Sequence, residues 1–188
     1  MGFLDTLLGR TKPVRPNLDV LFAVPTAAQN SLAGLGFEAT GVGAVCFKAA
    51  EGAAAGRSRA DVRELLTLDR TQEVELVDDE FGFTWAVCRQ AVPDLSALVV
   101  SLHVVNTTLV EAGFGAMLLC TAIGFRAGER RLGLVYLYKR GTVYPFVPRT
   151  ESSRDNALEL QIGAAIAADL PTESDVSRWF PIWHAPVP

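Results

Sequence analysis

One amphipathic segment near the middle of the chain constrains the fold more than any other. Between Asp94 and Gly113 apolar residues recur at steps of three and four, as they do on the buried face of a helix. The members of this stripe are Leu95, Leu98, Val99, Leu102, Val105 and Leu109. Asp94 can cap the first turn, Pro93 blocks extension backwards, and Gly113 can end the helix. Because burial of each such side chain contributes about 1.5 to 3 kcal/mol, we predict that this helix anchors the core.

The residues after this helix predict strands that it can cover. Residues 117–125 alternate between bulky side chains at odd positions and small ones at even positions, which indicates a strand with one face under a helix. Residues 132–139 alternate in the same way, and Arg140-Gly141 suits a tight hairpin into residues 142–147. Pro145 has no backbone N–H to donate, so we expect this last strand at an edge of the sheet.

A helix and a strand are expected before residue 50. Thr26 can cap a helix through Leu32 that ends at Gly34 and Gly36, and residues 37–48 predict the next strand. The glycines of this region are numerous enough to suggest a phosphate-binding loop. Such a loop follows a strand and opens a helix, whereas these glycines lead into a strand, so we reject a nucleotide site.

Residues 73–77 and 83–90 predict two further strands joined by the acidic turn Asp78-Asp79-Glu80. Three adjacent carboxylates could bind a divalent cation or a basic partner. We favour a solvated hairpin tip, because no second carboxylate cluster has a spacing that brings it near this turn. A capping-box-like start at Ser58 and Asp61 predicts a short helix before the two strands.

The last third of the chain predicts one more helix and an aromatic tail. Ser153 or Asp155 can cap a helix over residues 157–170, whose many glycines and alanines allow a sheet or a copy of the same helix to approach closely. The tail, residues 172–188, carries three large rings, Trp179, Phe180 and Trp183. These rings can fold back onto the body or serve as a docking tail, and we favour the first arrangement.

A short apolar segment opens the chain. Its apolar side chains fall on one helical face and are followed by a cation; they are Phe3, Leu4, Leu7, Leu8 and Arg10. We define residues 2–12 as the leader, which a proline-containing linker separates from the body. The leader can dock on the body, or it can bind an anionic membrane surface or a partner.

Composition bounds the class of protein. With 188 residues, 49% of them hydrophobic, the chain is expected to form a single domain over residues 1–188. The longest apolar run is interrupted by polar residues, so we expect a core helix and not a membrane span. We also expect no signal peptide, and the three cysteines, Cys46, Cys88 and Cys120, suit a reducing cytoplasm as unpaired core residues. A net charge of -4 argues against nucleic acid as a partner.

The sequence contains no recognisable catalytic constellation. His103 and His184 lie far apart and have no metal-ligand spacing, the cysteines form no C-x-x-C pair, and no serine lies in a G-x-S-x-G elbow. We therefore assign no catalytic, cofactor-binding or metal-binding residue, and we expect a protein that is not an enzyme.

The predicted order of elements is similar to that of the type III secretion chaperone-like and YbjN-like folds: an α+β structure in which a long central helix and a C-terminal helix cover an antiparallel sheet. The sequence itself also resembles a known family. The segments MGFLDTLLGRTKP, PNLDVLFAVPTAA, GAVCFK and WFPIW look like those of the actinobacterial PspA-associated protein PspAB family, over nearly the whole chain. This resemblance implies a cytoplasmic protein linked to the PspA envelope-stress (phage shock) system, and it carries over no catalytic motif.

Two hypotheses about function follow. The first is a non-enzymatic interaction or chaperone-like protein that acts with PspA, at the inner face of the membrane through a weak peripheral contact, and that is compatible with a homodimer. Its candidate interaction residues are Phe3, Leu4, Leu7, Leu8, Arg10, Trp179, Phe180 and Trp183. The second is a small-ligand-binding protein or an uncharacterised enzyme with a pocket between the central helix and the sheet. A deep polar pocket near His103, Arg126 or the acidic turn would favour the second hypothesis, and a flat apolar surface would favour the first.

Overall fold

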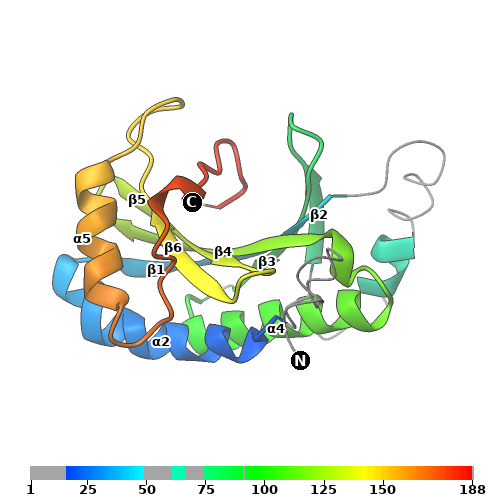
Figure 1. Ribbon diagram of the computed structural model, residues 1–188. Coiled ribbons are helices and arrows are strands. Elements are labelled where there is room, and N and C mark those ends of the chain that lie inside the picture. The colour runs from blue at the N-terminus through cyan, green and yellow to red at the C-terminus, as the bar shows by residue number, and fades with distance from the viewer. Residues whose placement is uncertain (1–15, 49–60, 67–73, 91, 188) are drawn as a thin grey trace, which may run out of the picture.

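The computed structural model describes residues 16–48, 61–66, 74–90 and 92–187. The predicted α+β class is confirmed, because one six-stranded antiparallel sheet packs against helices (Figure 1). The strands are β1 (Glu38–Phe47), β2 (Val74–Asp78), β3 (Thr84–Arg89), β4 (Leu118–Ala127), β5 (Arg130–Leu137) and β6 (Thr142–Phe146). Their order in the sheet is β2-β3-β1-β4-β5-β6, and every neighbouring pair is antiparallel.

The helical segments are short except for two. They are η1 (Leu18–Ala23), α2 (Val24–Ala27), η2 (Ala28–Leu32), η3 (Ala33–Leu35), α4 (Leu95–Glu111), η4 (Gly115–Met117), α5 (Asn156–Ile166) and η5 (Val176–Arg178), together with helical residues 61–66. The sheet is curved: α2 and α4 run along its convex face, α5 lies beyond β6, and the tail lies on the concave face (Figure 1). Within the described ranges, no helix has both the length and the apolar character needed to span a bilayer.

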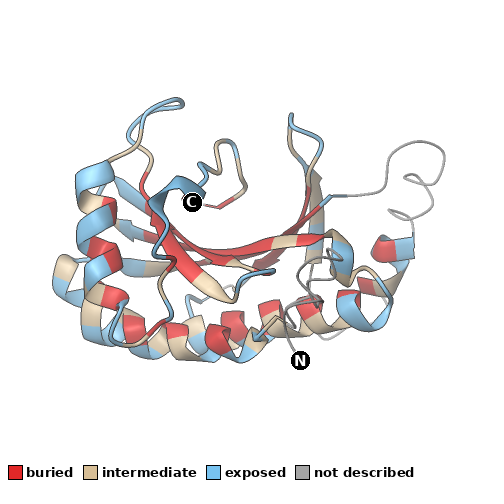
Figure 2. Ribbon diagram, in the orientation of Figure 1, coloured by how far each residue is buried: buried red, intermediate tan, exposed pale blue. Residues whose placement is uncertain are grey.

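Helix α4 confirms the predicted central helix. The Asp94 carboxylate caps it by accepting a hydrogen bond from the Ala97 N–H at 3.0 Å. The predicted stripe is buried except for Leu95, which is half-buried, and the helix packs mainly on β1 and η1 and also on β3. Figure 2 shows these buried residues along the side of the helix that faces the sheet. The apolar periodicity therefore identified the element on which the core is built.

The helical region before β1 begins earlier than predicted. The cap is Asn17 and not Thr26, since the Asn17 side chain accepts a hydrogen bond from the N–H two residues later at 3.2 Å. Helical turns of 3-10, α and π type then continue without a break over residues 18–35. Pro25 is tolerated because it lies in the first turn of α2, where its missing N–H has little cost. The predicted end is correct, since Gly36 adopts a left-handed φ of 80°.

Strand β4 departs from the predicted alternation at its start. Cys46 of β1 lies opposite Cys120, as a regular ladder requires. The next residue of β1, Phe47, lies opposite Leu118, so Leu119 is an extra residue in a β-bulge. The bulge turns Leu119 to the same face as Cys120, away from the helices, whereas the prediction placed Leu119 on the helix-covered face. Leu118, which the prediction placed on the same face as Cys120, also lies on the helix-covered face, and residues 120–125 alternate as predicted.

The remaining elements agree with the sequence apart from one boundary. The β2–β3 hairpin forms around the acidic turn, and Pro145 lies in β6 at the edge of the sheet, as predicted. Asp155 is the cap of α5, since its carboxylate accepts a hydrogen bond from Leu158 N–H at 3.1 Å. Helix α5 ends four residues before the predicted end at residue 170. After the helix, Val143 N–H donates to Pro171 O and Glu173 N–H donates to Val143 O, which forms one isolated parallel bridge beside β6.

Candidate docking pocket on the free face of the sheet

Each face of the sheet carries its own buried apolar cluster. The larger cluster fills the space between the sheet and the helices. The second cluster lies on the opposite face, which we call the free face, where the tail covers the strands (Figure 2). Its buried members are Ala44, Cys46, Trp85, Val87, Cys120, Ala122, Val135, Tyr144, Phe146, Trp179 and Val187.

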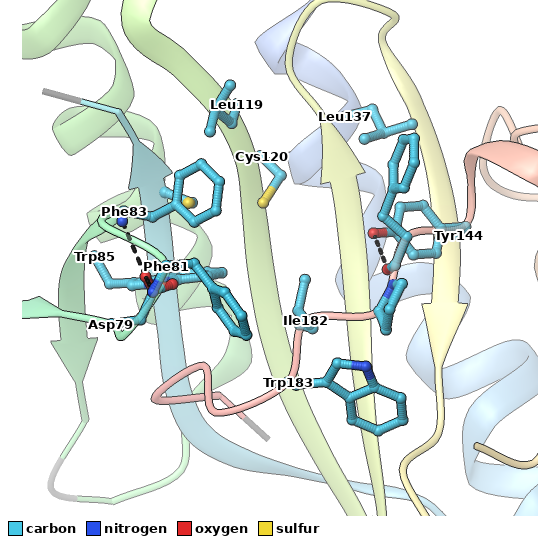
Figure 3. Close-up of a pocket in the computed structure, with 13 residues that line it drawn as sticks. Asp79, Phe81, Phe83, Trp85, Leu119, Cys120, Leu137, Tyr144, Ile182 and Trp183 are labelled. Carbon is cyan, nitrogen blue, oxygen red and sulfur yellow. Dashed lines mark hydrogen bonds between the residues drawn. The ribbon is translucent and has the colours of Figure 1, made fainter. Parts of the chain in front are cut away.

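An apolar pocket of about 310 Å³ opens on this free face. The hairpin tip contributes Asp79, Phe81, Phe83 and Trp85; the strands contribute Cys46, Leu119, Cys120, Leu137 and Tyr144; the tail contributes Phe180, Pro181, Ile182 and Trp183. Figure 3 shows the hairpin residues on one side of Cys120 and the tail residues Ile182 and Trp183 on the other, with Leu137 and Tyr144 further out on the side of the tail. Three segments that are far apart in sequence therefore form one site, which we call the free-face pocket.

Asp79 builds the hairpin wall of the pocket. One of its carboxylate oxygens accepts hydrogen bonds from the backbone N–H groups of Phe81 and Phe83 at 3.0 and 2.9 Å (Figure 3). The other oxygen accepts a hydrogen bond from Trp85 Nε1 at 2.9 Å. The carboxylate thus holds the aromatic tip in place, as expected of a hairpin tip and not of a cation site. Across the described ranges no three histidine, cysteine, aspartate or glutamate residues are grouped as metal ligands.

The tail wall is held by hydrogen bonds to backbone atoms of its aromatic residues. The Tyr144 hydroxyl donates to Phe180 O at 2.8 Å, and Arg154 donates to Trp179 O at 2.5 Å. The indole Nε1 of Trp179 donates to Glu173 O at 2.9 Å. These bonds fix the course of the chain through residues 173–180, so that the side chains that follow can line the pocket.

Two buried glutamates, Glu159 and Glu173, bind residues that hold the tail in place. The Glu159 carboxylate accepts a hydrogen bond from Val147 N–H at 2.7 Å and forms a salt bridge with Arg154 at 2.8 Å. Burial disfavours its charged form and raises its pKa, although both of these donors oppose that shift. Burial would also raise the pKa of Glu173, but hydrogen bonds from Arg140, from the Asp175 N–H and from Thr142 lower it overall.

Two of the buried thiols, Cys46 in the pocket and Cys88 on the helix side, have a raised pKa. All three cysteines are free and buried, as the sequence predicted. The hydrogen bond between Cys46 and Cys120, followed by burial, raises the pKa of Cys46, and burial raises the pKa of Cys88, on the helix side, to about 12. A reactive thiolate needs the opposite shift. Asp79, Trp85 and Tyr144 therefore have hydrogen-bond partners within the protein, and the space between them suits an apolar group.

The comparison with protein families agrees with the sequence resemblance. A family model described as PspA associated protein B matches residues 1–187. The chain belongs to this family. Neither a curated protein nor a solved structure matches the chain. Association with the PspA system is thus what membership of the PspA associated protein B family suggests, and the pocket geometry must supply the detail.

The structure separates the candidate interaction residues of this PspA associated protein B family member. In the tail, Trp179 is buried, Trp183 is half-buried against the edge of Phe146, and Phe180 is 61% exposed at the pocket rim. The leader residues Phe3, Leu4, Leu7, Leu8 and Arg10 lie outside the described residues. The pocket also lies on the face opposite α4, whereas the ligand-binding hypothesis placed one between that helix and the sheet.

Sequence reasoning missed the contribution of the hairpin tip. Phe81, Phe83 and Trp85 form one wall of the free-face pocket. The sequence-based prediction for this turn considered only the acidic residues beside them. The available signal was the pair of phenylalanines that flank Gly82 in a turn, because aromatic side chains at a hairpin tip need a surface to cover. His103 and Arg126, the other positions considered, do not line this pocket.

Proposed function

We propose that the protein is a non-enzymatic, chaperone-like interaction protein of the PspA-linked envelope-stress system, and that the free-face pocket receives apolar side chains of a protein partner. PspA is the first candidate partner. The proposal rests on one observation: the pocket is open and apolar, and its carboxylate, Asp79, and its hydroxyl, Tyr144, already have hydrogen-bond partners in the protein. The proposal includes a cytoplasmic location, with weak contacts that bring the protein to the inner face of the membrane.

The rim of the pocket supports this proposal. Phe81 is 57% exposed and Phe180 is 61% exposed, and they stand on opposite walls of the same cavity. Large exposed aromatic side chains beside an apolar hollow are typical of binding hot spots. Their removal should weaken partner binding without harm to the fold, because neither ring is part of a buried core.

Co-purification with PspA tests the proposal. Phe81→Ser combined with Phe180→Ser should weaken binding at least about tenfold, as expected when central aromatic contacts are lost. The matched control is Val92→Ser combined with Val176→Ser, which removes apolar side chains that are 77% and 55% exposed but lie away from the pocket. Equal loss in both double variants, or no loss in the first, would refute the pocket as the docking site.

A small apolar ligand is the second candidate occupant. The volume of about 310 Å³ is at the lower end of the range for small-molecule sites. Native mass spectrometry of freshly purified protein distinguishes the two candidates. A bound apolar molecule that is lost in the Phe81→Ser, Phe180→Ser variant would support the ligand, and a mass equal to that of the chain would support the protein partner.

A further inference from the structure

The described chain begins beside the end of strand β5. The Tyr136 hydroxyl, on the helix-covered face, donates a hydrogen bond to Asn17 O at 3.0 Å. Leu137 is the next residue and the last of β5, and its side chain lines the free-face pocket. Successive side chains of a strand point to opposite faces. The attachment point of the leader and the pocket therefore lie on two sides of the same strand end.

The leader is long enough to pass around this strand end. Eight residues lie between Leu8 and Asn17, and the nine steps that join these two residues span up to about 30 Å when extended. The distance through a packed sheet layer is only about 10 Å. The apolar residues of the leader can therefore reach the free face without displacing any strand.

The chemistry of the leader matches that of the pocket. Four apolar residues, Phe3, Leu4, Leu7 and Leu8, have the spacing that would place them on one face of a helix, and they are followed by Arg10 and Lys12. The pocket has the exposed rings of Phe81 and Phe180 at its rim, and the acidic turn carries the exposed residues Asp78 and Glu80 beside it. A neighbouring histidine, His184, lies 3.3 Å from Glu80 and is the tail group that faces this turn. An apolar hollow beside carboxylates suits an apolar segment followed by cations.

We propose that the leader of the same molecule occupies the free-face pocket, with its apolar face in the hollow and its cations toward the acidic turn. The partnership with PspA is not needed for this contact, because both halves of it belong to one chain. The contact covers the apolar pocket in the isolated protein.

Reaction of Cys120 with a small maleimide tests this contact in the full-length chain. Cys120 lines the pocket and is 8% exposed, whereas Cys88 lies on the helix-covered face and is 2% exposed. Leu4→Asp combined with Leu7→Asp should accelerate labelling of Cys120 about tenfold, which corresponds to about 1.4 kcal/mol of docking free energy. Labelling of Cys88, identified by peptide mass spectrometry, should not change. The control Asp5→Asn combined with Thr6→Ala changes the polar positions of the leader and should leave both rates as they are.

A synthetic peptide of residues 2–15 completes the test. Added to the Leu4→Asp, Leu7→Asp protein, it should restore the protection of Cys120 in a saturable way, and the same peptide with aspartate at positions 4 and 7 should not. Equal Cys120 rates in the wild-type and variant chains would overturn the proposal. Protection that disappears on dilution would also overturn it and would assign the contact to a second copy. Equal acceleration of all three cysteines would show that the leader belongs to the core instead.

Discussion

The indole ring of Trp179 lies so close to Gly163 of α5 that a Cβ on the glycine would stand 2.9 Å from Cη2 of the ring. The ring cannot easily move away, because its Nε1 donates a hydrogen bond to Glu173 O. Its face also stacks on the Tyr144 ring at a centroid distance of 6.2 Å. The small-residue face of α5, which the sequence suggested for close packing, therefore receives the tail of the same chain. This contact joins the last helix to the wall of the free-face pocket.

Gly163→Ala should release the tail while it leaves the rest of the fold intact. The added methyl overpacks the ring at a cost of about 1 to 3 kcal/mol, whereas alanine improves the helix by up to about 1 kcal/mol. The substitution therefore destabilises the packing of the tail, whereas it stabilises helix α5. Limited proteolysis should therefore cut the tail faster, while the denaturant midpoint of the body changes little.

Gly34→Ala is the matched control for this change. Gly34 also lies in a helical segment, and nothing lies within 4 Å of a Cβ added there. The tail of the Gly34→Ala protein should be cut by the protease at the wild-type rate. If the two alanine variants are cut equally fast, the Gly163–Trp179 contact does not hold the tail.

Acid should also release the tail, through Glu173. The pKa of this carboxyl lies below its ordinary value of 4.5 in the folded chain, so the released tail binds a proton more readily. The anchor is thus fully present above pH 4.5 and is lost as the pH falls through the lower folded pKa. The pKa of Asp175 is lowered mainly by its hydrogen bond with Ser177, so Asp175 also makes acid destabilise the folded state. The pKa of Glu159 is raised, so Glu159 has the opposite effect on stability as the pH falls.

Tryptophan emission measures this acid response, because Trp85, Trp179 and Trp183 all contribute to the free face. Emission should shift to longer wavelength as the pH falls from about 6 to 3, before the body unfolds. Glu173→Gln should start from a looser tail and show a smaller shift. A pH response that is identical in wild type and Glu173→Gln would exclude Glu173 as the anchor.

Arg154→Ala should cost far more stability than its charge alone would suggest. Arg154 pairs with Glu159, whose side chain is 2% exposed, and it also donates to Trp179 O. Removal of one partner of a buried pair leaves the other charge without compensation, at a cost of about 3 to 5 kcal/mol. Arg149→Ala is the control, since the Arg149 side chain is 64% exposed and its surface pair with Asp155 contributes at most about 1 kcal/mol. Similar urea midpoints for the two variants would contradict this account.

The elements that the sequence predicted are those with a local cause. The central helix has a stripe that can be counted along the chain, and the hairpin at Gly141 has a turn residue with a φ of 69°. The bulge at Leu119 has no such mark, because it arises from the register of two strands more than 70 residues apart. The start of the first helical region was missed because the prediction placed its cap at Thr26, whereas Asn17 caps it and Pro25 is tolerated in the first turn of α2.

The pocket could be predicted only in part, for the same reason. The aromatic tail was evident, but its wall depends on contacts that join residues 173–183 to Tyr144 and Arg154. Nothing in the helical pattern marks Glu159 as buried, since its burial requires an arginine and a backbone N–H from outside its helix. Sites assembled from distant segments lack a periodic signal, whereas single helices and strands have one.

Leu102→Ala should destabilise the whole protein, because Leu102 is the centre of the contact between α4 and β1. Its side chain is fully buried, and Gly43 provides the room for it, since a Cβ at Gly43 would lie 2.7 Å from Leu102 Cδ1. Truncation of a buried leucine costs about 2 to 5 kcal/mol. Val100→Ala, on the exposed side of the same helix, should change the unfolding free energy by less than about 0.5 kcal/mol. Unchanged thermal stability of Leu102→Ala would remove α4 from the centre of the core.

Anionic vesicles should compete with the pocket for the leader. Its apolar face and the cations that follow it suit an anionic lipid surface, but a segment of this length binds weakly. We expect co-sedimentation with anionic vesicles at low salt and its loss as salt rises, because charges at a surface are screened beyond about 10 Å at 0.1 M ionic strength. A leader on the vesicle cannot fill the pocket, so bound protein should show faster maleimide labelling of Cys120. The Leu4→Asp, Leu7→Asp variant should neither sediment nor respond to vesicles. Sedimentation that leaves the Cys120 rate unchanged would mean that another surface of the protein binds the lipid.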